Sequence, residues 1–251
     1  FGAPRLLAVD LDTGEVVHDH AFGNDAAPLG SFLQDLQVSP DGQTVYIADL
    51  SFWRKSPAIV VHDVTTASDR RVLEGHPSVS AQDWIITTPA RRMVFFGGLA
   101  AMKPGIDSIA VSTDGRWLVY GAMSHDTLFR VPTSALLDRS LDDRGIAATV
   151  EALGRKPLSD GLSADLEGGI WITDVEHGAV LRMTPAGELE TWVKTPRIRW
   201  ADALSFGPEG WLYLADSAIP DQVMRSREHI ASQAPYHIFR FRPDVHGIPG
   251  Q

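Results

Sequence analysis

The sequence contains no cysteine among its 251 residues. It therefore has neither a disulfide framework nor a thiol nucleophile. Without cysteines, the sequence does not indicate whether the protein resides in an oxidising or a reducing compartment. No apolar run approaches the roughly 20 residues of a membrane-spanning helix, so no membrane partner is expected. Few segments have the 3.6-residue period of an amphipathic helix. None of the nine histidines has the H-E-x-x-H spacing of a zinc site. The scarcity of helical periodicity favours a fold built mainly from β-strands.

Positive charge is also scarce. Lys and Arg together number 22 against 32 Asp and Glu, which gives a net charge of −10. Nucleic-acid phosphates demand a basic surface, so no nucleic-acid partner is expected. The acidic excess suits a cation site, although such an excess more often serves solubility. The 22 glycines and 16 prolines are what many tight turns require.

One stretch of sequence occurs four times. It reads LSDGLSADLEGGIWITDVE from Leu158, and its counterparts begin at Phe32, Gly105 and Arg199. Each copy has an acid, a short alternating run, an Asp-Gly or Glu-Gly turn and a second apolar run, which predicts a β-hairpin. Aligned, the copies share a first acidic position, occupied by Asp35, Asp107, Asp160 and Asp202. Fourteen residues later stand Asp49, Gly121, Asp174 and Asp216.

Two further apolar segments follow each of the first three copies. They lie at 58–63 and 71–73, at 127–131 and 147–151, and at 179–183 and 189–193. Four antiparallel strands per repeated unit predict an all-β fold, a β-propeller. We expect residues 1–251 to form a single propeller domain. A β-sandwich is the rival fold, but it does not require self-similar units.

The first unit is incomplete. Residues 5–22 read as only the outer two strands of a blade, and only eight residues follow the last predicted strand at 237–243. We therefore expect that an N-terminal segment of about one blade is missing from the sequence. Four near-complete units, one half-unit and one missing segment together predict six blades, with seven as the alternative. Residues 82–98 predict an extra hairpin around Pro89 and Ala90, as an inserted flap or part of an irregular blade.

The register of the repeats predicts a metal site. Innermost propeller strands all start at one face, so the first-position acids should meet at the mouth of the central channel. Carboxylates held that close repel one another unless a cation is present, and Ca²⁺ before Mg²⁺ is the hard ion that suits them. The predicted metal ligands are Asp35, Asp107, Asp160 and Asp202. The alternative is a packing role, which is favoured for Asp49, Asp174 and Asp216.

Other residues are candidates at the same face. Glu176 and His177 follow a strand end and could form a proton-transfer pair, with an ordinary polar loop as the alternative. His125 lies in a loop that faces the same way. Trp53, Arg54 and Trp200 are candidate walls for an aromatic or sugar-like ligand.

Four segments carry a resemblance to a known family. VPTSALLD, KPLSDGL, TDVEHGAV and PYHIFRF resemble the bacterial branch of the yellow and major royal jelly protein family, over about residues 35–242. That family is similar, more distantly, to the six-bladed propellers of regucalcin and gluconolactonase. There an axial divalent ion is held by a Glu, two Asn-type positions and an Asp that also acts as base.

The resemblance implies roles for three of the acids. Asp160 would be ligand and general base, Asp107 would replace an Asn, and Asp35 would lie on the preceding ligand strand. The Glu would lie in the missing segment. The resemblance also implies a secreted or periplasmic location.

Three classes of function are open. The favoured one is a lactonase-like, metal-dependent hydrolase of a small cyclic ester, in which Asp160 moves the proton. The second is a tautomerase or isomerase, as the insect dopachrome-converting relatives imply. The third is a non-catalytic propeller that binds amines or other small molecules.

Overall fold

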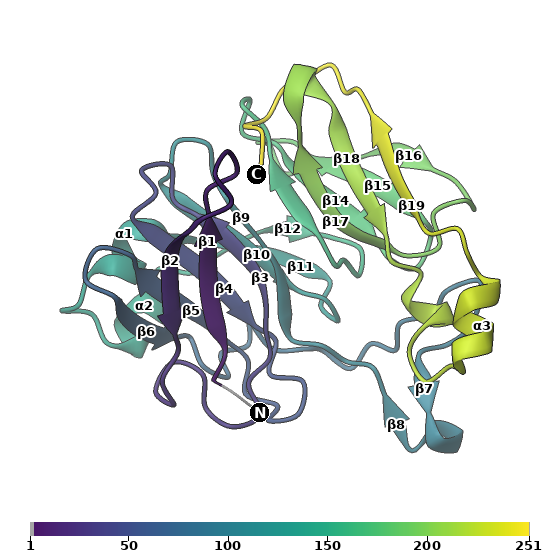
Figure 1. Ribbon diagram of the computed structural model, residues 1–251, viewed down its shortest axis with the longest axis horizontal. Helices are drawn as coiled ribbons and strands as arrows, with labels where there is room; N and C mark the ends of the chain where they lie inside the picture. Colours follow the sequence, from purple (N-terminus) through teal and green to yellow (C-terminus); the bar gives the residue numbers. More distant parts are fainter. Residues whose placement is uncertain (1–2, 251) are drawn as a thin grey trace.

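A computed structural model of the protein describes residues 3–250 and consists mainly of antiparallel β-sheets (Figure 1). Its first complete blade has the strand order β3-β4-β5-β6. The strands are β3 (Leu33–Val38), β4 (Thr44–Asp49), β5 (Ala58–Asp63) and β6 (Ser68–Val72). The two central strands are almost entirely buried, as expected for strands covered on both faces.

The second and third blades repeat this order. The second contains β9 (Ile106–Val111), β10 (Trp117–Ala122), β11 (Thr127–Pro132) and β12 (Glu151–Arg155). The third contains β13 (Leu162–Ala164), β14 (Ile170–Asp174), β15 (Ala179–Met183) and β16 (Leu189–Lys194). The fourth has three strands, β17 (Ala201–Phe206), β18 (Leu212–Asp216) and β19 (His237–Phe241). Each repeat copy thus forms the two inner strands of a blade.

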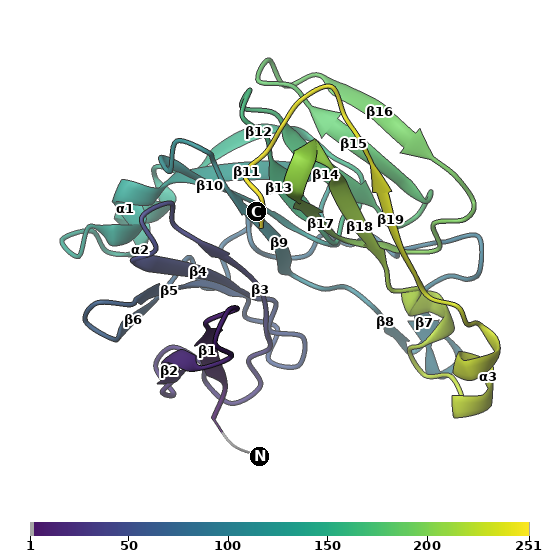
Figure 2. The same ribbon diagram turned by 45° about the horizontal axis from the view of Figure 1, so that its top comes forward.

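The blades are arranged as a β-propeller. The innermost strands β3, β9, β13 and β17 contact one another in chain order, and the outer strands fan away from them (Figures 1 and 2). Apolar side chains fill the spaces between neighbouring blades, with Tyr120 buried between the first and second and Trp171 between the third and fourth. The propeller prediction is confirmed, and residues 3–250 form four of its blades.

The predicted strand at 147–151 is wrong. Residues Asp143–Ala147 form helix α2, and β12 begins only at Glu151. The side chain of Asp142 accepts a hydrogen bond from the backbone N–H of Gly145 at 2.8 Å, which caps the helix at its N-terminus. A second short helix, α1 (Thr133–Leu137), precedes it, and a third, α3 (Arg227–Ser232), lies between β18 and β19.

Two small hairpins accompany the blades, as predicted. Strands β1 (Arg5–Val9) and β2 (Val16–Ala21) form a two-stranded sheet beside the first blade. The hairpin around Pro89 and Ala90 is closed by a hydrogen bond from Thr88 N to Arg91 O at 3.0 Å. It leads into the short strands β7 (Val94–Phe95) and β8 (Ala100–Ala101). No helix in residues 3–250 is long and apolar enough to span a membrane.

Candidate functional site

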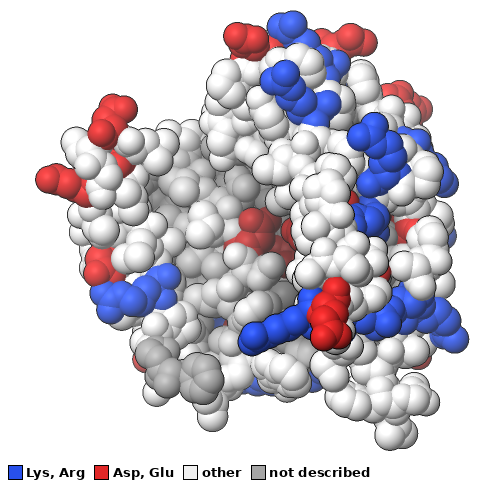
Figure 3. All heavy atoms as spheres, turned by 45° about the vertical axis from the view of Figure 1, so that its right-hand side comes forward, with Lys and Arg blue, Asp and Glu red and all other residues white. Residues whose placement is uncertain are grey.

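The four first-position acids line one cavity. Asp35, Asp107 and Asp202 lie near the start of their innermost strands, and Asp160 lies two residues before β13. Together they border a cavity of about 170 Å³, whose other lining residues come from the same four segments. Acidic side chains lie inside a hollow on the face shown in Figure 3. The structure therefore brings these acids together as the repeat predicts, whereas their role as metal ligands stays a prediction.

The backbone around Asp160 is fixed by a buried threonine and a glycine. Thr173 Oγ1 accepts hydrogen bonds from the N–H groups of Asp160 and Gly161, at 3.0 and 2.9 Å. A Cβ atom on Gly161 would lie only 2.1 Å from the carbonyl oxygen of Asp202. Glycine is therefore required for the third and fourth blades to approach this closely. That approach places Asp160 beside Asp202.

The cavity raises the pKa of all four acids. Burial is the largest cause in each case, and it raises the pKa of Asp35 to about 6 and that of Asp160 to about 7. Burial and then the charge of Asp160 raise the pKa of Asp107 well above its ordinary value. The carboxyl groups of Asp107 and Asp160 lie close enough that each changes the pKa of the other. Burial of two neighbouring carboxyl groups favours protonation of one of them in the absence of a cation.

Trp200 is not an exposed wall of the site, and that prediction is wrong. Its side chain is 0% exposed, because it packs in an apolar cluster with Ile86, Met93 and Val175. The indole Nε1–H donates a hydrogen bond to Asp160 Oδ2 at 2.5 Å. Trp200 therefore positions the carboxylate of Asp160 from below the cavity surface.

The sequence did not single out Lys156, which lies next to the acids. Its side chain is buried, and Nζ donates to the carbonyl oxygens of Ala122 and Pro157 at 3.0 and 3.1 Å. Burial lowers its pKa to about 7, while the charges of Asp126 and Asp107 oppose this. A Cβ atom on Gly121 would lie 2.5 Å from Lys156 Cε. Gly121, the one second-position residue that is not an acid, thus makes room for Lys156. This departure from the acidic pattern is the feature of the sequence that could have pointed to the lysine.

The second-position acids have the packing role that the sequence favoured. Asp49 is 0% exposed and accepts hydrogen bonds from Phe32 N and from Arg71 Nη1, at 2.8 and 2.6 Å. Asp216 accepts from Trp200 N at 2.8 Å. Asp174 accepts from the backbone N–H groups that follow it. Each of the three carboxylates closes a loop at a strand end.

Glu176 and His177 do not line the acid cavity. Glu176 Oε1 accepts a hydrogen bond from Thr87 N at 2.6 Å, which ties the hairpin at Pro89 to the third blade. The His177 ring lies 2.9 Å from the Asp174 carboxylate and is 57% exposed. The two side chains thus have separate partners, so the predicted proton-transfer pair is not formed in this structure.

The remaining candidates also lie outside the cavity lining. His125 is buried, its Nδ1 accepts from Thr127 N at 2.9 Å, and burial lowers its pKa. Trp53 is 78% exposed and contacts the ring of Phe52. Arg54 forms an ion pair with Glu74. His125 stabilises a turn, and Trp53 is the one predicted wall residue with a freely exposed ring.

Comparisons with known proteins identify relatives of this chain in sequence and in fold. The chain is 28% identical to 6-deoxy-6-sulfogluconolactonase of Pseudomonas putida over 132 residues, which is 50% of this chain and 41% of that enzyme. The chain thus spans well under half of this curated relative.

Solved structures share the fold at low sequence identity. A calcium-binding regucalcin from Agrobacterium tumefaciens matches with a TM-score of 0.62 and 18% identity, over 96% of this chain and 70% of that one. A gluconolactonase from Xanthomonas campestris matches with a TM-score of 0.53 and 14% identity, over 83% and 61% of the two chains. Residues 1–192 match the family model of the major royal jelly proteins. The chain therefore belongs to the major royal jelly protein family.

Proposed function

We propose that this protein is a lactonase-like hydrolase that opens a small cyclic ester at the acid cavity, with a bound divalent cation, Ca²⁺ before other ions. The observation that carries the proposal is the convergence of four carboxylates from four blades on one cavity of about 170 Å³. The partial likeness to 6-deoxy-6-sulfogluconolactonase supports a lactone as substrate. A six-bladed count for the complete propeller belongs to the same proposal.

The residue types present suit a hard cation, but no three of the cavity acids bring ligand atoms within 4.8 Å of one another among residues 3–250, so a bound ion would have to draw them closer. Carboxylate oxygens are the ligands that Ca²⁺ prefers, and a cation would offset the repulsion between Asp107 and Asp160 when both are ionised. Asp35 and Asp202 would add charge at the same cavity. When bound, the ion would polarise the ester carbonyl and favour ionisation of a water molecule.

Asp160 is the proposed proton acceptor. Without a bound ion its pKa is about 7, and a cation would favour the ionised form that can accept a proton. The indole of Trp200 holds Oδ2 of this carboxylate, so the side chain is oriented before substrate arrives. Lys156 lies close enough to Asp107 for their charges to interact, and it offsets part of the negative charge behind the cavity.

Hydrolysis of δ-gluconolactone tests the proposal. The chelator-treated protein should hydrolyse this lactone no faster than buffer does, and Ca²⁺ should restore turnover. If the Ca²⁺-saturated protein still left the buffer rate unchanged and instead bound the lactone, a non-catalytic binding propeller would be the better function.

Replacing Trp200 with Phe is expected to move the pH profile of turnover. Phe keeps the apolar packing but removes the hydrogen bond that lowers the pKa of Asp160. A hydrogen bond to a charged group contributes about 1.5–3 kcal/mol, so the acidic limb of kcat should move up by roughly one to two pH units. Trp192→Phe is the matched control, because Trp192 contacts Trp171 outside the cavity. An unchanged profile in Trp200→Phe would contradict the positioning role.

The effect of Ca²⁺ on stability should depend on pH. The pKa values of Asp35 and Asp160, about 6 and about 7, exceed the value of about 3.9 in an unfolded chain. Such groups favour folding below the unfolded pKa, and this contribution is lost as pH rises through the folded pKa. Ca²⁺ binds the ionised carboxylates and should reverse that loss.

The gain in melting temperature on adding Ca²⁺ should therefore grow between about pH 5 and pH 8. Thermal melts with and without saturating Ca²⁺ measure it. An equal gain at both ends of this range would show that Ca²⁺ acts elsewhere.

A further inference from the structure

Strand β2 of the small N-terminal sheet has an unusual inner face. His18, His20 and Phe22 alternate along the chain and turn toward the first blade, where each contacts His62. Val17, one position out of phase, is 67% exposed. A strand that only docks on an apolar sheet would have the reverse pattern, with Val inward and polar side chains outward. Two imidazoles therefore occupy an interface where packing alone favours aliphatic side chains.

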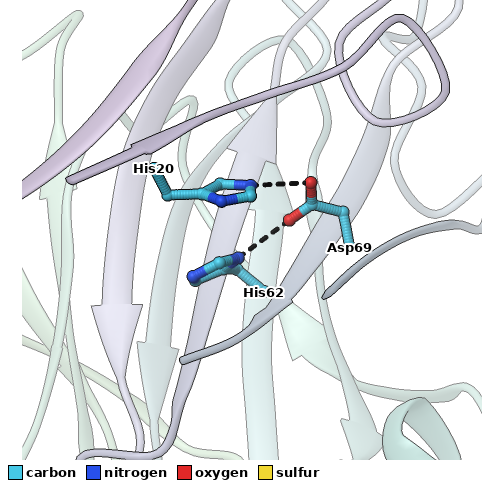
Figure 4. A group of neighbouring side chains, drawn as sticks. All are labelled: His20, His62 and Asp69. Carbon is cyan, nitrogen blue, oxygen red and sulfur yellow. Dashed lines mark hydrogen bonds and ion pairs between the residues drawn. The ribbon is translucent and has the colours of Figure 1, made fainter. Parts of the chain in front are cut away.

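The histidines converge on one carboxylate (Figure 4). His20 Nε2 lies 2.9 Å from Asp69 Oδ2, and His62 Nδ1 lies 2.8 Å from Asp69 Oδ1. One ligand atom from each of the three residues lies within 4.8 Å of the others, and this is the one such group among residues 3–250. His62 is 0% exposed, while the side chains of His20 and Asp69 are 14% and 17% exposed. A small ion could reach the cluster from the side of these two residues.

The geometry points to a second metal site, formed by His20 Nε2, His62 Nδ1 and the Asp69 carboxylate, that takes a divalent transition ion of the Zn²⁺ class. Two imidazoles and one carboxylate are a ligand set for Zn²⁺, with water as the fourth ligand, whereas Ca²⁺ prefers oxygen alone. Bonds of about 2.0–2.1 Å in a tetrahedral site separate neighbouring ligand atoms by roughly 3.3 Å. The present separations of 2.8 and 2.9 Å need to open only slightly.

His18 provides the outer partner of this site. Its Nε2 lies 3.1 Å from Nε2 of His62, the ring nitrogen that points away from Asp69. When Nδ1 of His62 binds the ion, its proton resides on Nε2 and is donated to His18. Histidines that bind metals usually donate their second N–H in this way, and the partner fixes the ring orientation.

The site would fasten the N-terminal sheet to the propeller. His20 comes from β2, while His62 and Asp69 come from β5 and β6 of the first blade. An ion shared between the two sheets would hold β1 and β2 against the first blade. This role is independent of lactone hydrolysis at the acid cavity.

Calorimetric titration of the full chain with Zn²⁺, in saturating Ca²⁺ to occupy the acid cavity, tests the site. The wild type should bind one Zn²⁺, and His20→Gln and Asp69→Asn should each weaken binding by at least about 100-fold. His229→Gln is the control, since His229 also contacts a carboxylate, that of Asp221 at 3.3 Å, but has no second histidine beside it. Its Zn²⁺ affinity should equal that of the wild type.

Two further readouts separate binding at this site from surface binding. Co²⁺ in place of Zn²⁺ should give tetrahedral d–d absorption that His20→Gln loses. Zn²⁺ should also slow amide hydrogen exchange in β1 and β2 and, at 100 times Kd, raise the melting temperature by roughly 5–10 °C. A folded wild type that binds no Zn²⁺ would overturn the proposal, as would equal affinities in wild type and His20→Gln. Lactone hydrolysis with Ca²⁺ should be the same in both proteins.

Discussion

Asp160→Asn is expected to lower kcat for lactone hydrolysis by roughly 10² to 10⁴, the usual contribution of a positioned base. Asn keeps the shape of the side chain and one oxygen, but it cannot accept the proton. In the absence of Ca²⁺ the fold should survive and gain stability, because the substitution removes a carboxylate whose ionisation burial disfavours. Turnover per folded molecule and the melting temperature should thus move in opposite directions.

The matched control is Asp114→Asn, the same change of charge in an exposed turn outside the cavity lining. Its turnover should stay within about twofold of the wild type. If Asp160→Asn kept both the bound metal and full activity, the assignment of Asp160 would be wrong, and a binding function would be favoured.

Asp165→Ala is expected to lower the free energy of unfolding by about 3–5 kcal/mol, with little effect on turnover per folded molecule. Asp165 is 0% exposed and accepts hydrogen bonds from Arg182 Nε at 2.7 Å and from Trp171 Nε1 at 3.0 Å. Alanine would leave the guanidinium of Arg182, itself 8% exposed, buried without its main partner.

Glu151→Ala is the control for Asp165→Ala, and both variants are measured by urea unfolding. Glu151 pairs with Arg130 at 2.7 Å, but both side chains are at least 35% exposed. Exposed ion pairs contribute at most about 1 kcal/mol. Equal losses in the two variants would contradict the role assigned to the buried pair.

The propeller was predictable because its signals are local. An acid, a Gly-containing turn and an aromatic second strand lie within each copy of the repeat, and the common register alone places Asp35, Asp107, Asp160 and Asp202 at one rim. Helix α2 was missed because Asp142 competes as an N-cap with the apolar pattern at 147–151.

The surroundings of the acids were less predictable, because they depend on contacts between distant segments. Trp200 appears as a surface residue in the sequence but is buried against the hairpin near Pro89. Lys156 could be recognised as a neighbour of the acids only from its packing against Gly121 in the folded structure. His20 and His62 meet only because the N-terminal sheet docks on the first blade. No spacing rule within one segment could have paired them.

Crystals grown with Ca²⁺ and then exchanged into Mn²⁺ test the central claim most directly. An anomalous difference map should contain a strong peak in the acid cavity, within coordination distance of carboxylate oxygens of Asp107 and Asp160. The peak should be absent from crystals of Asp160→Asn grown in the same way. A wild-type map without a peak in this cavity, from protein that hydrolyses lactone, would contradict the metal-dependent mechanism.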